Sequence, residues 1–424
     1  MPTQCASTIV ALTLLLTLTA RGEDWPRYRG PTGQGLTTET GLPIEWGGKE
    51  NKNVVWKTPL PATAAKGRAD NNQSSPIIWG DSIFVMTAYW PEGKPQSEIP
   101  EQHVTCYKLA DGARQWDTLV PPGPWHLTDM RGGYGAPTPA TDGQRVYVAF
   151  GSATIAALDL KSEGKIVWQH DIADYKSIDV AFASSPIVYR DTVLLLCGRN
   201  AKASTLTAYD AATGAVRWEQ KRPTVGFDHT TPVQVEIGGK PQLLIAAQNA
   251  LQGVDPETGA VLWWANTPGD VVSPVFQNGL IYTDSGRGGP GMAVEPSGTG
   301  DITKTAVKWK IGNIPEGLSS PAIFGDGLYR LHGPAVLRSF DMATGHERFT
   351  ARLDGVSTSS SPIVAPDGTI FLASAGKSYV IKAGPKIDIL ATNELGDGSS
   401  ASPAVAHGML ILKGSKYLYG IGKK

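Results

Sequence analysis

The chain has 424 residues, a formal net charge of −1 and a pI near 6.7. This balance provides no basic surface of the kind that attracts nucleic acid or an anionic membrane, so we expect neither as a partner. The 49 glycines and 31 prolines indicate many turns.

The chain begins with an apolar run, Ile9–Leu18, followed by Thr-Ala-Arg-Gly. The run is too short to span a bilayer but suits a secretory signal, so we predict a signal peptide over residues 1–22 and a periplasmic or extracellular location. The absence of Lys or Arg before the run is atypical. Cys5 precedes the run and therefore does not serve as a lipoprotein anchor at the cleavage site.

Residues 23–50 follow no repeat pattern and combine Gly, Pro and turn residues with Trp25, Tyr28 and Trp46. We predict that this segment is ordered by lying across one face or the rim of the rest of the chain, as a cap.

Residues 51–424 repeat one unit, which is clearest between Ser184 and Trp218. Each unit opens with a proline and contains four short apolar runs separated by turn residues. Ser, Thr and Ala flank nearly every opening proline, as expected where strands converge on an axis. A period of about 40–45 residues with four strands is typical of propeller blades. The opening prolines are Pro76, Pro139, Pro186, Pro232, Pro274, Pro321, Pro362 and Pro403. We therefore predict an all-β fold, an eight-bladed β-propeller of four-stranded antiparallel blades.

The last two strands of a blade are joined by Asp-x-x-x-Gly turns, as in Asp210–Gly214 and Asp341–Gly345. A large ring follows four residues after the glycine, for example Trp218. We interpret these rings as structural contacts with the neighbouring blade. The last repeat has only three apolar runs, so we expect an N-terminal strand around Trp56 to complete it and remove the open edge.

Cys106 and Cys197 fall in blades that are not neighbours, and we predict two buried thiols rather than a disulfide.

The unit Tyr209–Trp218 resembles the tryptophan-docking repeat of the PQQ (pyrroloquinoline quinone) propellers, which include quinoprotein alcohol dehydrogenases and non-enzymatic relatives. Trp25–Pro31 and Ser74–Asp81 are similar to secreted bacterial PQQ-like repeat proteins. The resemblance covers nearly all of the chain after the signal and implies the fold, but one scaffold hosts unrelated activities. A more distant resemblance to BamB-type assembly factors implies a docking scaffold.

The resemblance to the dehydrogenases implies PQQ held against a disulfide of adjacent cysteines, with calcium bound by Glu, Asn and Asp. This sequence has no adjacent cysteine pair and its blades are near the minimal repeat length. It also contains no Gly-x-Ser-x-Gly or His-Glu-x-x-His motif. We therefore predict no cofactor, metal or catalytic residue, and keep a PQQ- and calcium-dependent alcohol or sugar dehydrogenase as the alternative.

Propellers bind ligands mainly at the face that carries the loops between blades. The polar and aromatic residues that we assign to this candidate face are Asp70, Asn72, Trp125, His126, Asp129, Arg131, Tyr134, Asp228, His229, Arg287, Glu316 and His332. Such a mouth could bind a polar ligand, a metal or a peptide, and the alternative for any single residue is a solvated loop position.

The sequence thus predicts an exported, monomeric, non-catalytic binding or scaffold protein that binds a protein or a polar or carbohydrate ligand at this face. A further hypothesis, polysaccharide binding through Trp90 and Trp125, requires both rings to face solvent.

Overall fold

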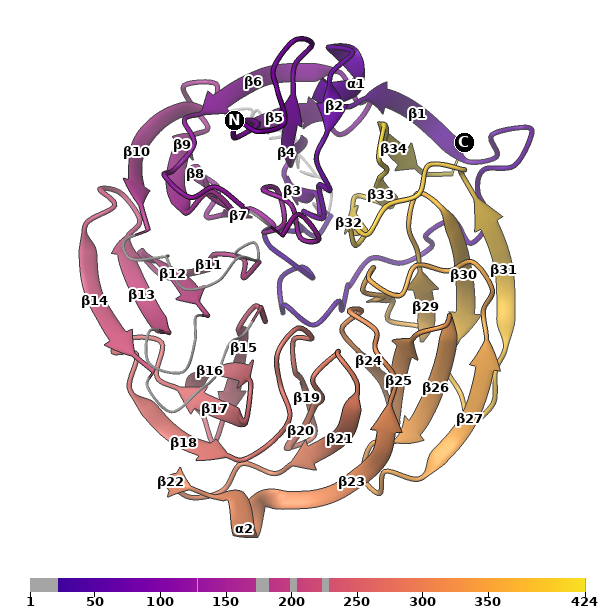
Figure 1. Ribbon diagram of the computed structural model, residues 1–424. Coiled ribbons are helices and arrows are strands. Elements are labelled where there is room, and N and C mark those ends of the chain that lie inside the picture. The colour runs from indigo at the N-terminus through magenta and orange to yellow at the C-terminus, as the bar shows by residue number, and fades with distance from the viewer. Residues whose placement is uncertain (1–21, 128, 173–182, 199–203, 223–228, 424) are drawn as a thin grey trace, which may run out of the picture.

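The computed structural model describes residues 22–127, 129–172, 183–198, 204–222 and 229–423. Within these ranges, eight sheets of four or five strands surround a central axis (Figure 1). The predicted eight-bladed propeller of four-stranded antiparallel blades is confirmed. Each innermost strand starts one residue after an opening proline, at Ile77, Ala140, Ile187, Val233, Val275, Ala322, Ile363 and Ala404.

The first four blades consist, from the axis outward, of β3 (Ile77–Trp79), β4 (Ser82–Trp90), β5 (Glu101–Lys108) and β6 (Arg114–Val120); β7 (Ala140–Thr141), β8 (Arg145–Phe150), β9 (Thr154–Asp159) and β10 (Lys165–Asp171); β11 (Ile187–Tyr189), β12 (Thr192–Cys197), β13 (Thr205–Asp210) and β14 (Val216–Lys221); β15 (Val233–Ile237), β16 (Lys240–Ala247), β17 (Ala250–Val254) and β18 (Val261–Ala265). Two short strands, β2 (Arg68–Ala69) and β22 (Gly300–Asp301), extend the first and fourth blades.

The last four blades consist of β19 (Val275–Gln277), β20 (Leu280–Thr283), β21 (Gly289–Val294) and β23 (Val307–Ile314); β24 (Ala322–Phe324), β25 (Gly327–His332), β26 (Val336–Asp341) and β27 (Glu347–Arg352); β28 (Ile363–Val364), β29 (Thr369–Leu372), β30 (Lys377–Lys382) and β31 (Ile389–Glu394); β32 (Ala404–Ala406), β33 (Met409–Lys413), β34 (Tyr417–Ile421) and β1 (Val54–Pro59). The eighth blade therefore combines strands from both ends of the chain. The helices of the described chain are α1 (Pro61–Ala64) and α2 (Thr303–Ala306).

The antiparallel order of each blade gives the propeller two different faces. The tight turns between the first and second strands and between the third and fourth strands lie on one face, which we call the hairpin face. The connections between blades and the loops between second and third strands lie on the other, which we call the loop face.

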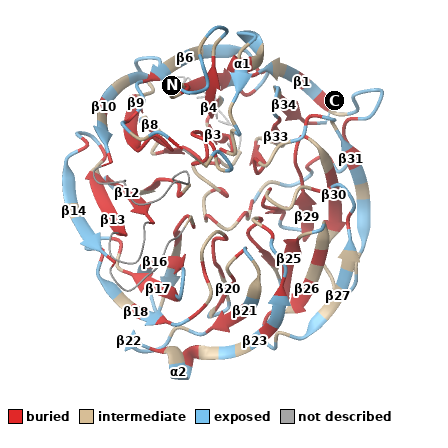
Figure 2. Cartoon of the chain, viewed as in Figure 1, coloured by how far each residue is buried: buried red, intermediate tan, exposed pale blue. Residues whose placement is uncertain are grey.

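Burial follows the position of a strand in its blade. The residues of β12 are all buried, because neighbouring blades cover both faces of a middle strand, whereas most residues of the outer strand β14 are exposed (Figure 2). This explains why middle strands read as continuous apolar runs and outer strands as mixed ones.

A ring of hydroxyl groups joins the inner ends of the blades. The residues directly before the opening prolines are Ser75, Thr138, Ser185, Thr231, Ser273, Ser320, Ser361 and Ser402. At seven of the eight junctions the backbone N–H of this residue donates to the hydroxyl of its counterpart in the next blade, at 2.9–3.1 Å. Between the fourth and fifth blades, the Ser273 hydroxyl instead donates to the Thr231 carbonyl at 2.9 Å. We call these eight residues the hydroxyl ring.

Large rings on the outer strands contact the turn of the next blade. The Trp56 indole N–H donates to the Leu109 carbonyl at 2.9 Å, and the Trp309 indole N–H donates to the Met342 carbonyl at 3.0 Å. The Trp309 ring lies so close to Gly345 that a Cβ there would come within 2.7 Å of it. Glycine at this turn therefore meets two requirements, a positive φ of 74° and space for the ring.

The segment before β1 crosses the hairpin face and touches blades on opposite sides of the ring (Figure 1). Trp25 exchanges two backbone hydrogen bonds with Ile78 of the first blade. Gln34 accepts a hydrogen bond from the Phe276 N–H of the fifth blade, and Glu39 accepts one from the Gly408 N–H of the eighth. These contacts order a segment that has no regular structure of its own.

The predicted signal peptide falls, except for Gly22, outside the described residues. No helix in the described ranges is long and apolar enough to cross a membrane. Cys106 and Cys197 are buried thiols in separate blades, as predicted.

A buried lysine links the eighth blade to the first. The Lys413 ammonium donates to the carbonyls of Ser74 and, at 3.2 Å, Met86. Lys413 is 1% exposed, and burial lowers the pKa of its ammonium to about 7. The closing junction therefore contains a group that can lose its charge near neutral pH.

We expect Gly345→Ala to destabilise the protein more than Gly408→Ala. Both glycines have nearly the same positive φ, 74° and 73°, but no atom lies within 4 Å of a Cβ added at Gly408. Urea denaturation gives the loss of unfolding free energy in each variant. The difference between the two losses then reports the displacement of the Trp309 ring and should be about 1–3 kcal/mol. Equal losses would contradict this contact.

We expect the stability of the protein to rise between pH 7 and pH 10 because of Lys413. In this interval the unfolded chain keeps a proton on Lys413, whose unperturbed pKa is about 10.4, and the folded chain releases it. The rise should be on the order of 3 kcal/mol, since each pH unit contributes about 1.4 kcal/mol. Urea titrations should show it lost in Lys413→Met and retained in Lys416→Met, which changes an exposed lysine. An unchanged slope in Lys413→Met would disprove the assignment.

Candidate functional site

A cavity of about 210 Å³ lies inside the hydroxyl ring. The ring residues in its wall are Ser75, Thr138, Ser185, Thr231, Ser273 and Ser402. All of these except Ser273 accept a backbone N–H from the preceding blade through their hydroxyl oxygen. Their own hydroxyl hydrogens have no acceptor among the described residues. The wall therefore presents several hydrogen-bond donors to whatever fills the cavity.

Tyr28 of the N-terminal segment forms part of the same wall, on the side of the hairpin face. Its hydroxyl hydrogen bonds with the Ser361 hydroxyl of the ring at 3.0 Å. The neighbouring Arg29 is 2% exposed and donates to the carbonyls of Gln34 at 2.8 Å and Pro321 at 2.5 Å. Burial lowers the pKa of the Arg29 guanidinium to about 10. The N-terminal segment is thus built into the axis of the propeller.

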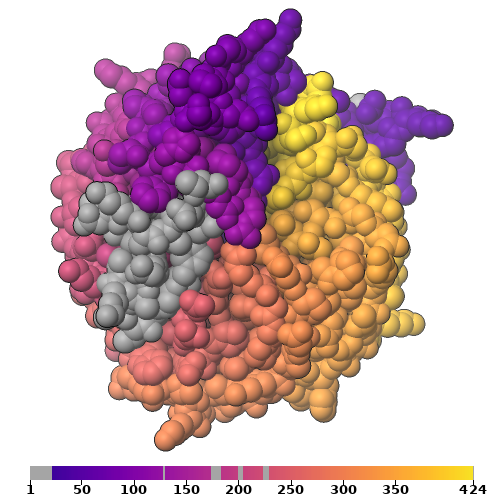
Figure 3. Space-filling model, viewed as in Figure 1, coloured from indigo at the N-terminus to yellow at the C-terminus, as the bar shows by residue number. Residues whose placement is uncertain are grey.

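Four titratable residues line the cavity toward the loop face, namely Arg131, His229, Arg287 and Glu316. They come from loops of different blades, and in the space-filling view purple and orange parts of the chain meet beside the centre of the ring (Figure 3). We call these four residues the mouth. The cavity therefore combines a neutral hydroxyl interior with a charged rim.

Carboxylates hold both guanidiniums of the mouth. Arg131 Nε lies 3.0 and 2.9 Å from the two carboxylate oxygens of Asp129, and these hydrogen bonds lower the pKa of Asp129. Arg287 Nε donates to Asp270 at 2.8 Å, and His229 Nδ1 lies 3.4 Å from the same carboxylate. Glu316 forms no ion pair among the described residues, so its carboxylate is the excess charge of the mouth.

The loop that carries Arg131 is fixed by the connection from the eighth to the first blade. The Asp70 carboxylate accepts the Tyr134 N–H, and the Gln73 amide donates to the Arg131 carbonyl at 3.0 Å. Asn72 exchanges two hydrogen bonds with the backbone of Ala88. Burial raises the pKa of Asp70, although the N–H groups that it accepts oppose this.

The predicted site residues separate into two groups. Arg131, His229, Arg287 and Glu316 line the cavity, with Asp129 bonded to Arg131. Most of the other described residues form hydrogen bonds that hold the loops in place. The Tyr134 hydroxyl, buried, accepts the Leu127 N–H at 2.9 Å.

His332 is 3% exposed, with its Nδ1 2.8 Å from the Gly333 carbonyl, and burial lowers its pKa. His126 is exposed, with its Nε2 2.7 Å from the Ser97 carbonyl, and Trp125 is partly buried. Asp228 lies outside the described residues.

The polysaccharide hypothesis does not hold for Trp90. This ring is 5% exposed and packs edge-on against Tyr134, and its indole N–H donates to the Glu98 carbonyl at 2.8 Å. The long β4–β5 hairpin and the 121–136 loop bury it together, which the local sequence does not reveal.

Sequence reasoning missed the hydroxyl ring as a cavity wall. Its signal was present, because Ser or Thr precedes all eight opening prolines, but these residues were interpreted only as small side chains near an axis.

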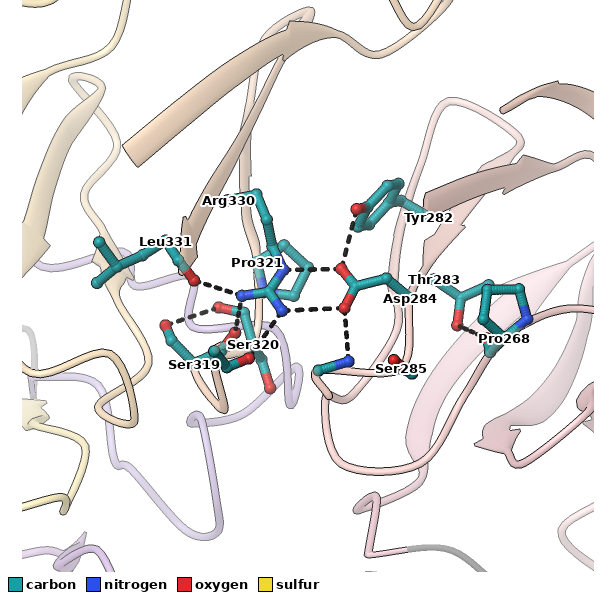
Figure 4. A network of polar contacts seen from close by, with 12 residues as sticks. Pro268, Tyr282, Thr283, Asp284, Ser285, Ser319, Ser320, Pro321, Arg330 and Leu331 are labelled. Carbon is teal, nitrogen blue, oxygen red and sulfur yellow. Dashed lines mark hydrogen bonds and ion pairs between the residues drawn. The ribbon is translucent and has the colours of Figure 1, made fainter. Parts of the chain in front are cut away.

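Sequence reasoning also missed a buried ion pair between the fifth and sixth blades (Figure 4). Arg330 on β25 is fully buried and donates to both oxygens of Asp284, at 2.7 and 2.9 Å. The Tyr282 hydroxyl donates to the same carboxylate at 2.9 Å. Burial alone would raise the pKa of Asp284, but the Arg330 charge and these hydrogen bonds hold it below its usual value.

A family model described as "Outer membrane protein assembly factor BamB" matches residues 100–382. The chain belongs to this family. The predicted PQQ-like propeller is thereby confirmed.

Two solved structures share the fold of this family member. BamB from Moraxella catarrhalis matches with a TM-score of 0.57 and 13% identity, over 86% of this chain and 97% of that chain. A europium-containing methanol dehydrogenase matches with a TM-score of 0.56 and 14% identity, over 94% of this chain and 90% of that chain. At these identities the similarity concerns the fold alone. No curated protein matches the chain.

The described residues of this BamB-family chain do not fit PQQ with calcium as the family resemblance implies it. Cys106 and Cys197 lie in different blades and cannot form the adjacent disulfide. No group of three or more His, Cys, Asp or Glu residues in the described ranges could hold a metal ion. The excess Glu316 carboxylate at the mouth would also repel a quinone that carries several carboxylates.

We expect Asp284→Asn to destabilise the protein by about 3–5 kcal/mol at pH 7, because it leaves the Arg330 charge buried without a counterion. Asp354→Asn, which removes one partner of the exposed Arg352–Asp354 pair, should cost less than about 1 kcal/mol. Urea denaturation gives both values.

The same pair predicts an acid sensitivity. Because the folded-state pKa of Asp284 lies below its unfolded value, its stabilisation is complete above about pH 4 and is lost as the pH falls through the folded-state pKa. The wild type should therefore lose more stability than Asp284→Asn between pH 5 and pH 2. Parallel losses would contradict an ionised Asp284.

Proposed function

We propose that this chain is an exported, non-catalytic binding or scaffold protein that binds a partner or polar ligand at the loop face. The observation that carries the proposal is the mouth: loops from several blades converge on one cavity and present fixed charges around it. Binding residues are commonly placed on loops that a rigid scaffold positions, and concave sites with a few convergent polar groups are the usual ligand sites.

The pairing of the mouth charges favours recognition. Asp129 and Asp270 hold the two guanidiniums in place, so a partner meets oriented donors without having to order them first. Arginine is also among the residues that contribute most to binding energy in interfaces.

The family description supports a docking role as well. It names an assembly factor, a protein that works through partners. Export of this chain is proposed from the apolar run Ile9–Leu18, and a periplasmic or extracellular partner follows from it. The europium-containing methanol dehydrogenase shares the fold, but the cofactor fit described above gives no support for a dehydrogenase function in this chain.

We expect Arg131→Glu to weaken partner binding at least about tenfold, or about 1.4 kcal/mol, while leaving the fold intact. The matched control is Arg217→Glu, which breaks a comparable exposed arginine–aspartate pair with Asp210 on the hairpin face. The tagged full chain and both variants are compared by capture from cell-envelope and culture fractions with quantitative mass spectrometry, followed by biosensor affinities for each enriched protein.

If a protein is still enriched by Arg131→Glu but not by Arg217→Glu, the binding surface lies on the hairpin face, which would contradict the proposal. Equal enrichment in all three proteins would leave the loop face without a role in binding.

A further inference from the structure

The axial cavity can be matched to a class of ligand by counting what its wall offers. Five of the ring hydroxyls that lie in the wall have accepted a backbone N–H and keep a hydrogen to donate. Two of them, Ser75 and Ser402, lie in neighbouring blades across the closing junction. Glu316 and Gln73 add acceptor oxygens at the rim. A ligand that both donates and accepts along its surface satisfies such a wall, whereas an apolar ligand would leave these groups unpaired at a cost of about 1–3 kcal/mol each.

The charges of the rim exclude most ionic ligands. Arg131 and Arg287 are neutralised by Asp129 and Asp270, so neither is free to balance an incoming anion. The remaining Glu316 carboxylate repels an anion further. A cation would meet this single carboxylate but also the two guanidiniums, and no group of three or more His, Cys, Asp or Glu residues in the described ranges could hold a metal ion.

The cavity is large enough to hold a small ligand. Its volume of about 210 Å³ gives room for one molecule of monosaccharide size, and Tyr28 contributes an aromatic wall with a hydroxyl on the side of the hairpin face. Sugars combine hydroxyl groups with an apolar ring face, so they match both parts of this wall.

We propose that the axial cavity binds a neutral polyhydroxylated ligand of monosaccharide size, with the hydroxyl ring as donors, Glu316 and Gln73 as acceptors and Tyr28 as the aromatic wall. This rests on the proposed binding function of the loop face and names the ligand class of its central cavity. The ligand enters past the mouth, where Glu316 selects against anions.

The test uses the purified full chain and three matched series of probes. The neutral sugars glucose, galactose and N-acetylglucosamine are compared with their charged counterparts glucuronate, galacturonate and glucosamine, respectively. Myo-inositol is added as a neutral polyol without a ring oxygen. Ligand-detected saturation-transfer NMR gives affinities, and thermal shift checks that binding stabilises the fold. We expect saturable binding of at least one neutral polyol, with its uronate binding at least tenfold more weakly.

Three variants locate the site. Ala183→Phe fills the cavity from a position in its wall and should abolish binding, whereas Ala212→Phe makes the same change at an exposed turn and should not. Glu316→Gln removes the excess charge at an exposed position, so it should leave the neutral sugar bound and reduce its preference over the uronate to less than threefold. This third variant keeps the proposal testable should Ala183→Phe fail to fold.

Absence of saturable binding by every neutral polyol would overturn the proposal, as would a uronate that binds more tightly than its neutral sugar. Unchanged affinity in a folded Ala183→Phe protein would place the sugar elsewhere and overturn the cavity assignment. If no sugar binds but Arg131→Glu still weakens partner binding, only the proposal of a cavity ligand is refuted. If a sugar binds but Arg131→Glu has no effect on partner binding, only the proposed scaffold role is refuted.

Discussion

The hydroxyl ring is the constraint on which the rest of the structure depends. Each blade brings a backbone N–H to the axis directly before a proline, and at seven of the eight junctions the neighbour's Ser or Thr hydroxyl accepts it. Because the same bond recurs around the circle, it sets the spacing of the inner strands and thereby the width of the cavity. The residues that join the blades are also the residues that line the site, so the lining cannot change without affecting the scaffold.

Farther from the axis, the junctions are not equivalent. Most use a ring packed on a glycine of the next blade, as Trp309 does on Gly345. Single junctions add a buried charged group: Asp284 with Arg330 between the fifth and sixth blades, and Lys413 between the eighth and first. The fourth and fifth blades differ again, with β22 added to the edge of the fourth blade. A repeated contact gives the ring its shape, and the irregular ones distinguish one junction from another.

The sequence predicts what is local and repeated, and little else. Pro321 and its counterparts mark every inner strand, because proline suits a first strand position and the repeat period shows the register. Pairings between distant loops are not visible in this way. The His229 imidazole lies 3.4 Å from the Asp270 carboxylate, which comes from the next junction, and nothing in the sequence near either residue indicates this pairing. The path of residues 22–50 across the axis likewise depends on contacts with several blades, which no periodicity encodes.

The pairing of β1 with β34 has a consequence for how the molecule is made. Val54 pairs with Ile421, so the strand synthesised first waits for the strand synthesised last. Until then β1 has no partner strand and both ends of the incomplete circle expose unpaired edges, which are sites of aggregation. Contacts between residues so distant in sequence slow folding. A chain that folds in this order depends on protection of its strand edges during synthesis. Truncation at either end of the propeller would leave such an edge exposed in the finished molecule.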